Sequence, residues 1–422
     1  MSSPVWHPFT QHGLGEPIPL VARAEGAALF TADGRRIIDA ISSWWVTTHG
    51  HRHPRIMQAI ADQAQKLDQI IFAGWTHEPA EAVARELVAI LPEPLRHVFF
   101  SDSGSTSVEV ALKMALGYWA NRGEPRHRIL VLDHGYHGDT IGGMSVGARG
   151  VFNAPYAPLL FDVGSLPFPH LGAEQATLDS LDAYCRAREA PAALIVEPLI
   201  CGAGGMLIYA PQVLAEMRAI CARHRVLFIA DEVMTGWGRT GSLLACQQAG
   251  IVPDIICLSK GLTGGALPLA VTVATPEIFD AHHSTDRAKM FFHSSSYTAN
   301  PIACAAARAN LEIWRDEPVL ERIAALSSLQ RTHLDRLAAL PGVNNARCIG
   351  TITALEIGAG NGDYLSALGP RLLAFFGARD LLIRPLGNTI YVMPPYCIDA
   401  ADLAAVHDSI ADAVEWVAKR GS

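Results

Sequence analysis

Between residues 97 and 275, short apolar runs alternate with amphipathic segments, and no other feature of the chain restricts its fold as much. The runs are HVFFSD, RILVLD, AALIVEP, VLFIADE, IICLSK and LAVTVAT. Apolar residues at helical spacing lie between them, for example Val213, Leu214, Met217, Ile220 and Cys221. Strands that alternate with helices form a mainly parallel sheet covered on both faces. The sequence therefore predicts an α/β fold with a large, mainly parallel sheet.

The pattern changes after about residue 310. A helical stretch around ALSSLQRTHLDRLAAL is followed by the apolar runs CIGTITALEIG, DLLIRPL and TIYVMPPY, and a last helix is expected over residues 400–418. The chain of 422 residues is longer than a single compact domain usually is. We predict a large α/β domain over residues 51–310 and a smaller α+β domain over residues 311–422, with residues 1–50 contributing to the smaller domain.

Charge and hydropathy restrict the partners of the chain. The net charge is -8, and no run of lysine or arginine could neutralise a phosphate backbone. No stretch reaches the roughly 18 to 20 apolar residues of a membrane helix, and MSSPVWHPFT lacks the regions of a signal peptide. The eight cysteines are scattered, without a CxxC pair. We expect a soluble protein of the reducing cytoplasm that binds neither nucleic acid nor membrane.

Two of the predicted strands end in residues of opposite charge. Asp231 ends the strand in IADEVMTGWGRTG, and Lys260 follows the strand in DIICLSKGLTGG. Ligands of open α/β sheets bind at the carboxyl ends of the strands. Pyridoxal phosphate needs such a pair, because a lysine binds its aldehyde and moves the substrate proton while a carboxylate keeps its ring nitrogen protonated. Either residue alone is explained equally well as a loop cap or a solvated lysine, but the joint pattern favours a cofactor site.

Three further motifs differ in what they indicate. In SDSGSTSVEVALKMAL, Gly104 and Ser105 stand at a predicted helix start and are candidates to bind phosphate, although an ordinary helix cap would look the same. In GYHGDT, Tyr136 could stack on a cofactor ring with Asp139 as its polar neighbour, although single aromatics more often pack in a core. HGHRHP, residues 49–54, gathers three histidines without an acid or cysteine to complete a ligand set, so no metal is expected.

In this order, SDSGS, GYHGDT, IADEV-TG-GRTG and SKGLTGG resemble the motifs of the class III aminotransferases, which are fold-type I pyridoxal-phosphate enzymes. The likeness covers essentially the whole chain. It implies Lys260 as the lysine that carries the cofactor, Asp231 at the ring nitrogen and Tyr136 on the ring. It also implies Gly104 and Ser105 at the phosphate.

Ser296 extends this resemblance to a second subunit. In HSSSYTANP it stands where the family usually has a threonine that reaches the phosphate of the neighbouring subunit's cofactor. The resemblance therefore implies a homodimer with active sites at the subunit interface.

Other motifs resemble the family members that convert 8-amino-7-oxononanoate into 7,8-diaminononanoate in biotin biosynthesis. These motifs are WHPFT, SSWWVTTHGHRHP, DSGSTSVEVALKMALGYW, EPLICGAGGM and IRPLGNTIYVMPPY. The resemblance implies that Arg384 binds the carboxylate of the keto-acid substrate, with the planar fork that suits carboxylates. The other substrate-binding residues that it implies are Phe9, Trp44, Trp45, Asp139, Arg239 and Tyr391.

The amino donor depends on two features of these motifs. Trp44 and Trp45 form a broad aromatic pair that suits the sulfonium and adenosyl group of S-adenosylmethionine, which we expect as the donor. Phe9 stands where the best-known pattern, WHPYT, has a tyrosine, and relatives resembling the lysine-using enzyme also have phenylalanine there but lack the full tryptophan pair.

Three alternatives stay open. They are lysine as the donor, an ω-amino-acid:pyruvate transaminase of the same family, and a nucleotide-binding α/β regulator without a covalent cofactor.

Overall fold

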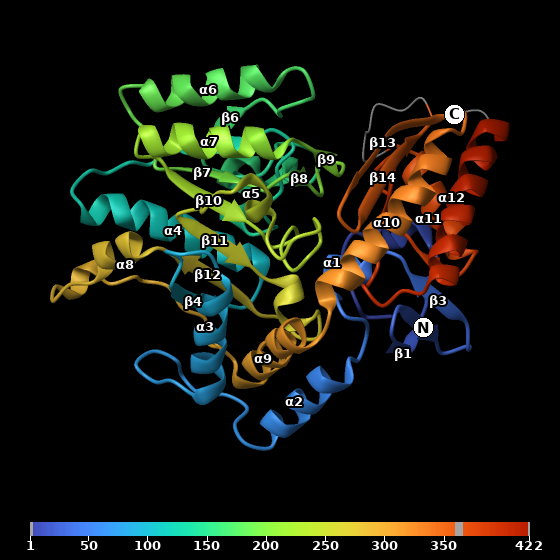
Figure 1. Ribbon diagram of the computed structural model, residues 1–422, viewed down its shortest axis with the longest axis horizontal. Helices are drawn as coiled ribbons and strands as arrows, with labels where there is room; N and C mark the ends of the chain where they lie inside the picture. The colour runs from blue at the N-terminus through green and yellow to red at the C-terminus, as the bar shows by residue number, and fades with distance from the viewer. Residues whose placement is uncertain (1–2, 359–365, 421–422) are drawn as a thin grey trace.

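The computed structural model describes residues 3–358 and 366–420 (Figure 1). Its largest sheet has the strand order β4-β12-β11-β10-β7-β5-β6. The strands are β4 (His97–Ser101), β5 (Ile129–Leu132), β6 (Gly164–Leu166), β7 (Ala193–Val196), β10 (Leu227–Asp231), β11 (Ile255–Leu258) and β12 (Ala270–Ala274). Only β12 runs antiparallel to its neighbours β4 and β11. The predicted large, mainly parallel sheet is confirmed, and its short edge strand β6 is the one that the sequence pattern missed.

Helices cover both faces of this sheet (Figure 1). Because side chains alternate along a strand, Leu227 and Ile229 of β10 pack in one apolar cluster with α4, and Phe228 packs on the opposite face with α6 and α7. The apolar positions predicted on α7 are all buried. The helices beside this sheet are α3 (Glu78–Ile90), α4 (Gly104–Asn121), α5 (Ile141–Ser145), α6 (Glu174–Arg186), α7 (Pro211–Arg223), α8 (Pro276–His282) and α9 (Pro301–Asp316). Helix α2 (Pro54–Ala64) packs on α9.

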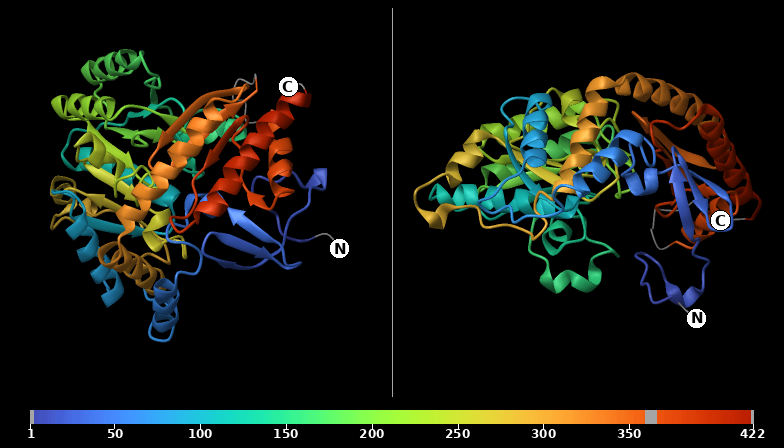
Figure 2. Two further views of the ribbon diagram at one scale, coloured as in Figure 1. Left: turned by 45° about the vertical axis from the view of Figure 1, so that its right-hand side comes forward. Right: turned by 90° about the horizontal axis from the view of Figure 1, so that it is seen from below.

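A second group of elements lies beside the large sheet, where both figures place the amino-terminal strands next to the carboxy-terminal helices (Figures 1 and 2). It contains the antiparallel sheet β13-β14-β16 and the sheet β1-β2-β3-β15. The strands are β1 (Val21–Glu25), β2 (Ala28–Thr31), β3 (Arg36–Asp39), β13 (Val343–Ile349), β14 (Ile352–Ile357), β15 (Leu381–Leu382) and β16 (Thr389–Val392). The helices are α10 (Val319–Ala338), α11 (Leu368–Gly377) and α12 (Ala400–Arg420).

The amino-terminal segment joins this second group through β3, which pairs in parallel with β15. The run DLLIRPL thus contributes only a two-residue strand, and it lies in a different sheet from the runs on either side of it. Residue 310 lies inside α9, so we propose the boundary of the large domain after Asp316. Within residues 3–358 and 366–420, no helix combines the length and apolar character that crossing a membrane requires.

Candidate active site

A cavity of about 450 Å³ lies where several parallel strands of the large sheet end. Asp231 is the last residue of β10, Glu197 directly follows β7, and Lys260 follows β11 after one residue. The sequence-predicted residues that line the cavity are Phe9, Trp44, Trp45, Gly104, Ser105, Tyr136, Asp139, Asp231, Lys260, Arg384 and Tyr391. The fold therefore brings together residues that are up to 382 positions apart in the chain, from Phe9 to Tyr391.

Lys260 presents its amine inside this cavity. Its Nζ atom lies 4.6 Å from the centre of the Trp45 ring, and its own backbone has a φ of 45°. Burial lowers the pKa of Lys260 to about 8, while the nearby carboxylates of Asp231 and Glu197 act in the opposite direction. Near neutral pH the amine is thus far easier to deprotonate than that of an ordinary lysine.

Asp231 is buried and held from two sides. One carboxylate oxygen accepts a hydrogen bond from the backbone N–H of Val233 at 3.1 Å, and the other lies 2.7 Å from Nδ1 of His137. The Nε2 atom of His137 is buried and has no hydrogen-bond partner among the described residues. The pair fixes the direction of the Asp231 carboxylate at the cavity wall.

Glu197 is a second buried acid of the cavity wall. Its oxygens accept hydrogen bonds from the backbone N–H groups of Tyr136 at 2.9 Å and Gly202 at 3.0 Å. Burial raises the pKa of Glu197 to about 7. This carboxyl group therefore changes its charge in the neutral pH range, next to Lys260.

The start of α4 forms another part of the wall. The Ser103 hydroxyl accepts from the N–H of Thr106 at 3.2 Å, while the Thr106 hydroxyl accepts from the N–H of Ser103 at 2.9 Å. This capping box leaves the intervening Gly104 and Ser105 at the cavity, at the positive end of an 18-residue helix. A Cβ atom on Gly104 would lie 2.5 Å from Cγ1 of Val233, so the backbone approach requires glycine. Such a helix start binds anionic groups, phosphate above all.

Phe9, Trp44 and Arg384 form the exposed side of the cavity. The rings of Phe9 and Trp44 lie 5.4 Å apart edge to face, and the Arg384 guanidinium lies 5.3 Å from the Trp44 ring centre. Arg384 also donates to the backbone oxygen of Phe9 at 3.2 Å. Deeper in the cavity, the Trp45 indole donates to the Tyr391 hydroxyl at 3.0 Å. The two tryptophans thus separate a cationic entrance from the buried lysine.

The family model of the class-III aminotransferases matches residues 10–414 of the chain. This chain belongs to the class III aminotransferases. Two named relatives are adenosylmethionine-8-amino-7-oxononanoate aminotransferases. The one from Synechococcus elongatus is 49% identical, over 98% of this chain and 99% of its own length. The one from Mycobacterium leprae is 38% identical, over 97% of this chain and 94% of its own length.

Solved structures of aminotransferases have the same fold. The adenosylmethionine-8-amino-7-oxononanoate aminotransferase of Methanocaldococcus jannaschii superposes with a TM-score of 0.92 at 32% identity, covering 98% of this chain and 97% of that one. A PLP-bound amine transaminase from an uncultivated Pseudomonas species gives 0.93 at 31% identity, covering 99% of both chains. The predicted fold-type I architecture of the aminotransferase is confirmed.

Two of the predicted site residues of this aminotransferase do not line the cavity of their own chain. Arg239 is buried behind the wall, where its guanidinium donates to the backbone oxygens of Pro394 at 3.0 Å and Thr47 at 2.9 Å. Ser296 is exposed, and its backbone oxygen accepts from the side-chain amide of Gln69 at 2.5 Å. Arg239 therefore supports the wall from behind, and Ser296 lies at the surface.

The sequence interpretation missed two ionisable residues that line the cavity, His137 and Glu197. His137 stands next to Tyr136 in GYHGDT, and Glu197 begins EPLICGAGGM directly after a predicted strand. Their positions after strands were the available signal. Their partners could not be inferred, because the contact between His137 and Asp231 joins residues 94 positions apart.

Proposed function

We propose that this aminotransferase uses pyridoxal phosphate to convert 8-amino-7-oxononanoate into 7,8-diaminononanoate in biotin biosynthesis, with S-adenosylmethionine as the amino donor. The observation that carries the proposal is Arg384, which lines the exposed side of the cavity that also contains Lys260. The keto acid carries its carboxylate at the far end from the carbonyl that receives the amino group. A guanidinium at the entrance suits that carboxylate, while the carbonyl reaches the lysine. The named relatives support the same substrate.

The donor set around the cavity fits pyridoxal phosphate. Lys260 supplies an amine for its aldehyde, Asp231 a buried carboxylate for its ring nitrogen, and the start of α4 at Gly104 and Ser105 an anion site for its phosphate. The buried Nε2 atom of His137 has no hydrogen-bond partner among the described residues, so this end of the cavity contains a polar atom that the chain itself leaves unpaired. When bound, the cofactor takes up the electron pair left on the substrate carbon after its proton is removed.

The other steps depend on side chains of the protein. Lys260 would hold the cofactor, and its amine would move the proton at the reacting carbon, which its pKa of about 8 favours near neutral pH. Asp231 keeps a proton on the ring nitrogen through its negative charge, and His137 orients the carboxylate. Tyr136 and Asp139 lie in the loop after β5, where they share a hydrogen bond of 3.0 Å at the cavity wall.

The tryptophan pair supports S-adenosylmethionine as the donor. Trp44 is 38% exposed, so its ring offers an accessible π face to a sulfonium cation, and Arg384 already occupies a cation–π position near it. Phe9 is the observation that favours the second candidate donor, lysine, because it offers no hydroxyl to the adenosyl-bearing substrate.

A donor panel tests this function. Purified enzyme loaded with pyridoxal phosphate is incubated with 8-amino-7-oxononanoate and either S-adenosylmethionine, lysine or alanine, and 7,8-diaminononanoate is measured by mass spectrometry. We expect product with S-adenosylmethionine, and faster turnover with the Phe9→Tyr variant. Product with lysine but not with S-adenosylmethionine would show that lysine is the donor. If no donor gives 7,8-diaminononanoate and the enzyme instead transfers an amino group from an ω-amino acid to pyruvate, its function is that of an ω-amino-acid:pyruvate transaminase.

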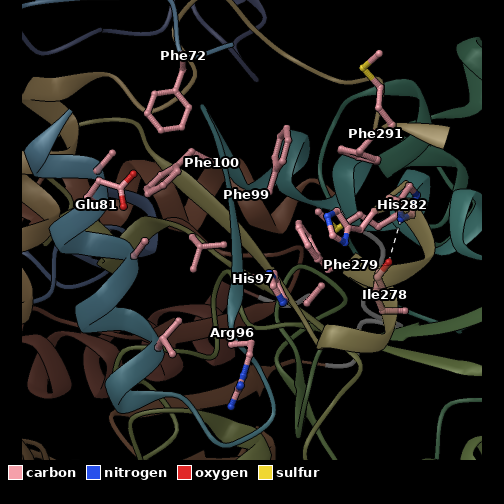
Figure 3. A pocket seen from close by; sticks show the side chains of 18 of the residues that line it. Phe72, Glu81, Arg96, His97, Phe99, Phe100, Ile278, Phe279, His282 and Phe291 are labelled. Atoms are coloured by element: carbon pink, nitrogen blue, oxygen red, sulfur yellow. Dashed lines mark hydrogen bonds between the residues drawn. The ribbon is translucent and has the colours of Figure 1, made fainter. Parts of the chain in front are cut away.

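We further propose that the active enzyme is a homodimer. A groove of about 760 Å³ runs along β4, one of the two edge strands of the large sheet, and Figure 3 shows aromatic side chains projecting into it. The labelled phenylalanines are Phe72, Phe99, Phe100, Phe279 and Phe291. Neighbouring large apolar side chains are exposed, among them Trp75 at 64% and Phe292 at 63%. An unpaired edge with so much exposed apolar surface suits a second copy of the chain.

Ser296 lies in the same exposed segment as Phe292, which supports a site shared between subunits. Sedimentation should give twice the chain mass for the native protein and a single chain mass for Phe292→Asp, with loss of cofactor colour. Leu171→Asp is the matched control, because Leu171 is 98% exposed and lies away from the groove. A native protein that sediments as one chain and is fully active would contradict the shared site.

We place the enzyme in the cytoplasm. All eight cysteines are free thiols, and six of them are buried. A reducing compartment keeps such thiols unpaired.

A further inference from the structure

Four consecutive residues, the last two of which line the cavity, have left-handed backbone angles. The φ values are 52° for Ser42, 55° for Ser43, 104° for Trp44 and 71° for Trp45. Residues other than glycine rarely adopt such angles, and a run of them persists only where surrounding contacts enforce it. We call residues Ser42–Trp45, labelled α1 in Figure 1, the tryptophan turn. It carries both indoles of the cavity wall.

Asp39 makes four of the contacts that enforce this turn. One carboxylate oxygen accepts from the backbone N–H groups of Ile41 at 3.2 Å and Ser43 at 2.9 Å. The other accepts from the Ser43 hydroxyl at 3.0 Å and lies 2.8 Å from Nε2 of His51. The Asp39 side chain has no exposed surface. Every contact of the carboxylate is therefore made within the chain: two hold backbone N–H groups directly before the tryptophans, and a third holds the Ser43 hydroxyl.

His51 anchors this carboxylate to the rest of the protein. Its backbone exchanges two hydrogen bonds with Gly26, at 2.7 and 3.3 Å, next to the β1–β2 hairpin. The imidazole thus holds Asp39 against a rigid element. Neither Asp39 nor His51 lines the cavity, and the hydrogen bonds of Asp39 lead to the tryptophan turn, which does.

We propose that Asp39 and His51 are positioning residues that hold Trp44 and Trp45 in the strained turn and thereby set which amino donor the cavity accepts. The proposal rests on the proposed transamination. Without the carboxylate, the turn relaxes toward ordinary backbone angles, and Trp44 leaves its position between Phe9 and Arg384. A bulky adenosyl-bearing donor then loses more than a small donor, because only the bulky one needs the whole indole wall.

Donor preference measures this effect. Holoenzyme is mixed with S-adenosylmethionine or with 7,8-diaminononanoate, which donates in the reverse half-reaction, and the second-order rate constant for loss of the cofactor absorbance is measured for each without an acceptor, since the amino group then stays on the cofactor. For Asp39→Ala we expect the ratio of the two values to shift by about tenfold or more against S-adenosylmethionine, while the cofactor absorbance stays native. Asp39→Asn should restore the ratio, since its amide oxygen still accepts from the two backbone N–H groups and its NH₂ can donate to Ser43. Asp33→Ala, at an exposed acid of the nearby β2–β3 turn, is the matched control.

A ratio that stays native, or an equal loss for both donors, would overturn the proposal. If Asp39→Ala does not fold, His51→Ala carries the test, because it leaves the two backbone acceptor contacts in place and should give a smaller shift in the same direction. Wild-type enzyme that makes no 7,8-diaminononanoate contradicts the proposed function instead. The same variants are then compared on a bulky and a small donor that the wild type accepts.

Discussion

The low pKa of Lys260 predicts how fast the apoenzyme captures its cofactor at each pH. Only the neutral amine attacks an aldehyde, and burial lowers the pKa from 10.5 to about 8. At pH 8 about half of the Lys260 amines are then neutral, against about 0.3% for an ordinary lysine, since each pKa unit is a factor of ten. The rate of capture per molecule should therefore be about 150-fold higher at pH 8 than an unperturbed lysine would give.

The pKa of Lys260 also determines how the rate of cofactor capture changes with pH. Below pH 8 the amine is protonated, so the rate should fall about tenfold per pH unit, and above about pH 9 it should level off. Stripped enzyme is mixed with pyridoxal phosphate across this range, and the visible absorbance is followed in time. A small lysine derivative with an ordinary amine is the control, which also corrects for ionisation of the cofactor.

Asp231→Asn sharpens this test. The negative charge of Asp231 raises the pKa of Lys260, so its removal should move the midpoint of capture to still lower pH. A wild-type rate that keeps rising tenfold per unit up to about pH 10 would refute the reasoning, because it would show an unperturbed amine.

Three further substitutions have separate signatures. Asp231→Asn should keep the cofactor colour but slow turnover on the order of a hundredfold, since an amide cannot hold the ring nitrogen protonated; native single-turnover rates would contradict this. Arg384→Ala should raise KM for 8-amino-7-oxononanoate about tenfold or more with a normal spectrum, because it removes a charge-assisted partner; an unchanged KM would assign the carboxylate to another cation. Gly104→Ala should weaken cofactor binding, because its Cβ would lie 2.5 Å from Val233. Gly377→Ala, whose Cβ would have nothing within 4 Å, should not. Equal affinities of the two variants in titrations with pyridoxal phosphate would disprove the steric argument.

The sequence predicted those parts of the site that local pattern determines. Asp231 ends one strand and Lys260 follows another, both with unmistakable apolar runs, and parallel strands bring their carboxyl ends to one edge. Gly104 and Ser105 begin a helix whose cap is visible in SDSGST. The structure places all four around one cavity.

Contacts between distant segments could not be predicted in this way. Arg239 follows Asp231 in the same motif, yet its side chain turns to the backbone of residues 45–47 and 394, away from the cavity. The strain in the tryptophan turn is also invisible in SSWW, because it depends on Asp39 and His51. Only the tertiary fold decides which way such side chains point.

The most direct test of the account identifies the lysine that carries the cofactor. The chain has only five lysines, at positions 66, 113, 260, 289 and 419, so a peptide map can distinguish all of them. Holoenzyme is reduced with borohydride, digested, and analysed by mass spectrometry for a pyridoxyl-phosphate adduct. We predict loss of the visible absorbance and a stoichiometric adduct on Lys260, with none in Lys260→Ala. An adduct on any of the other four lysines, or a protein with neither colour nor adduct, would contradict the assignment of this cavity as the active site.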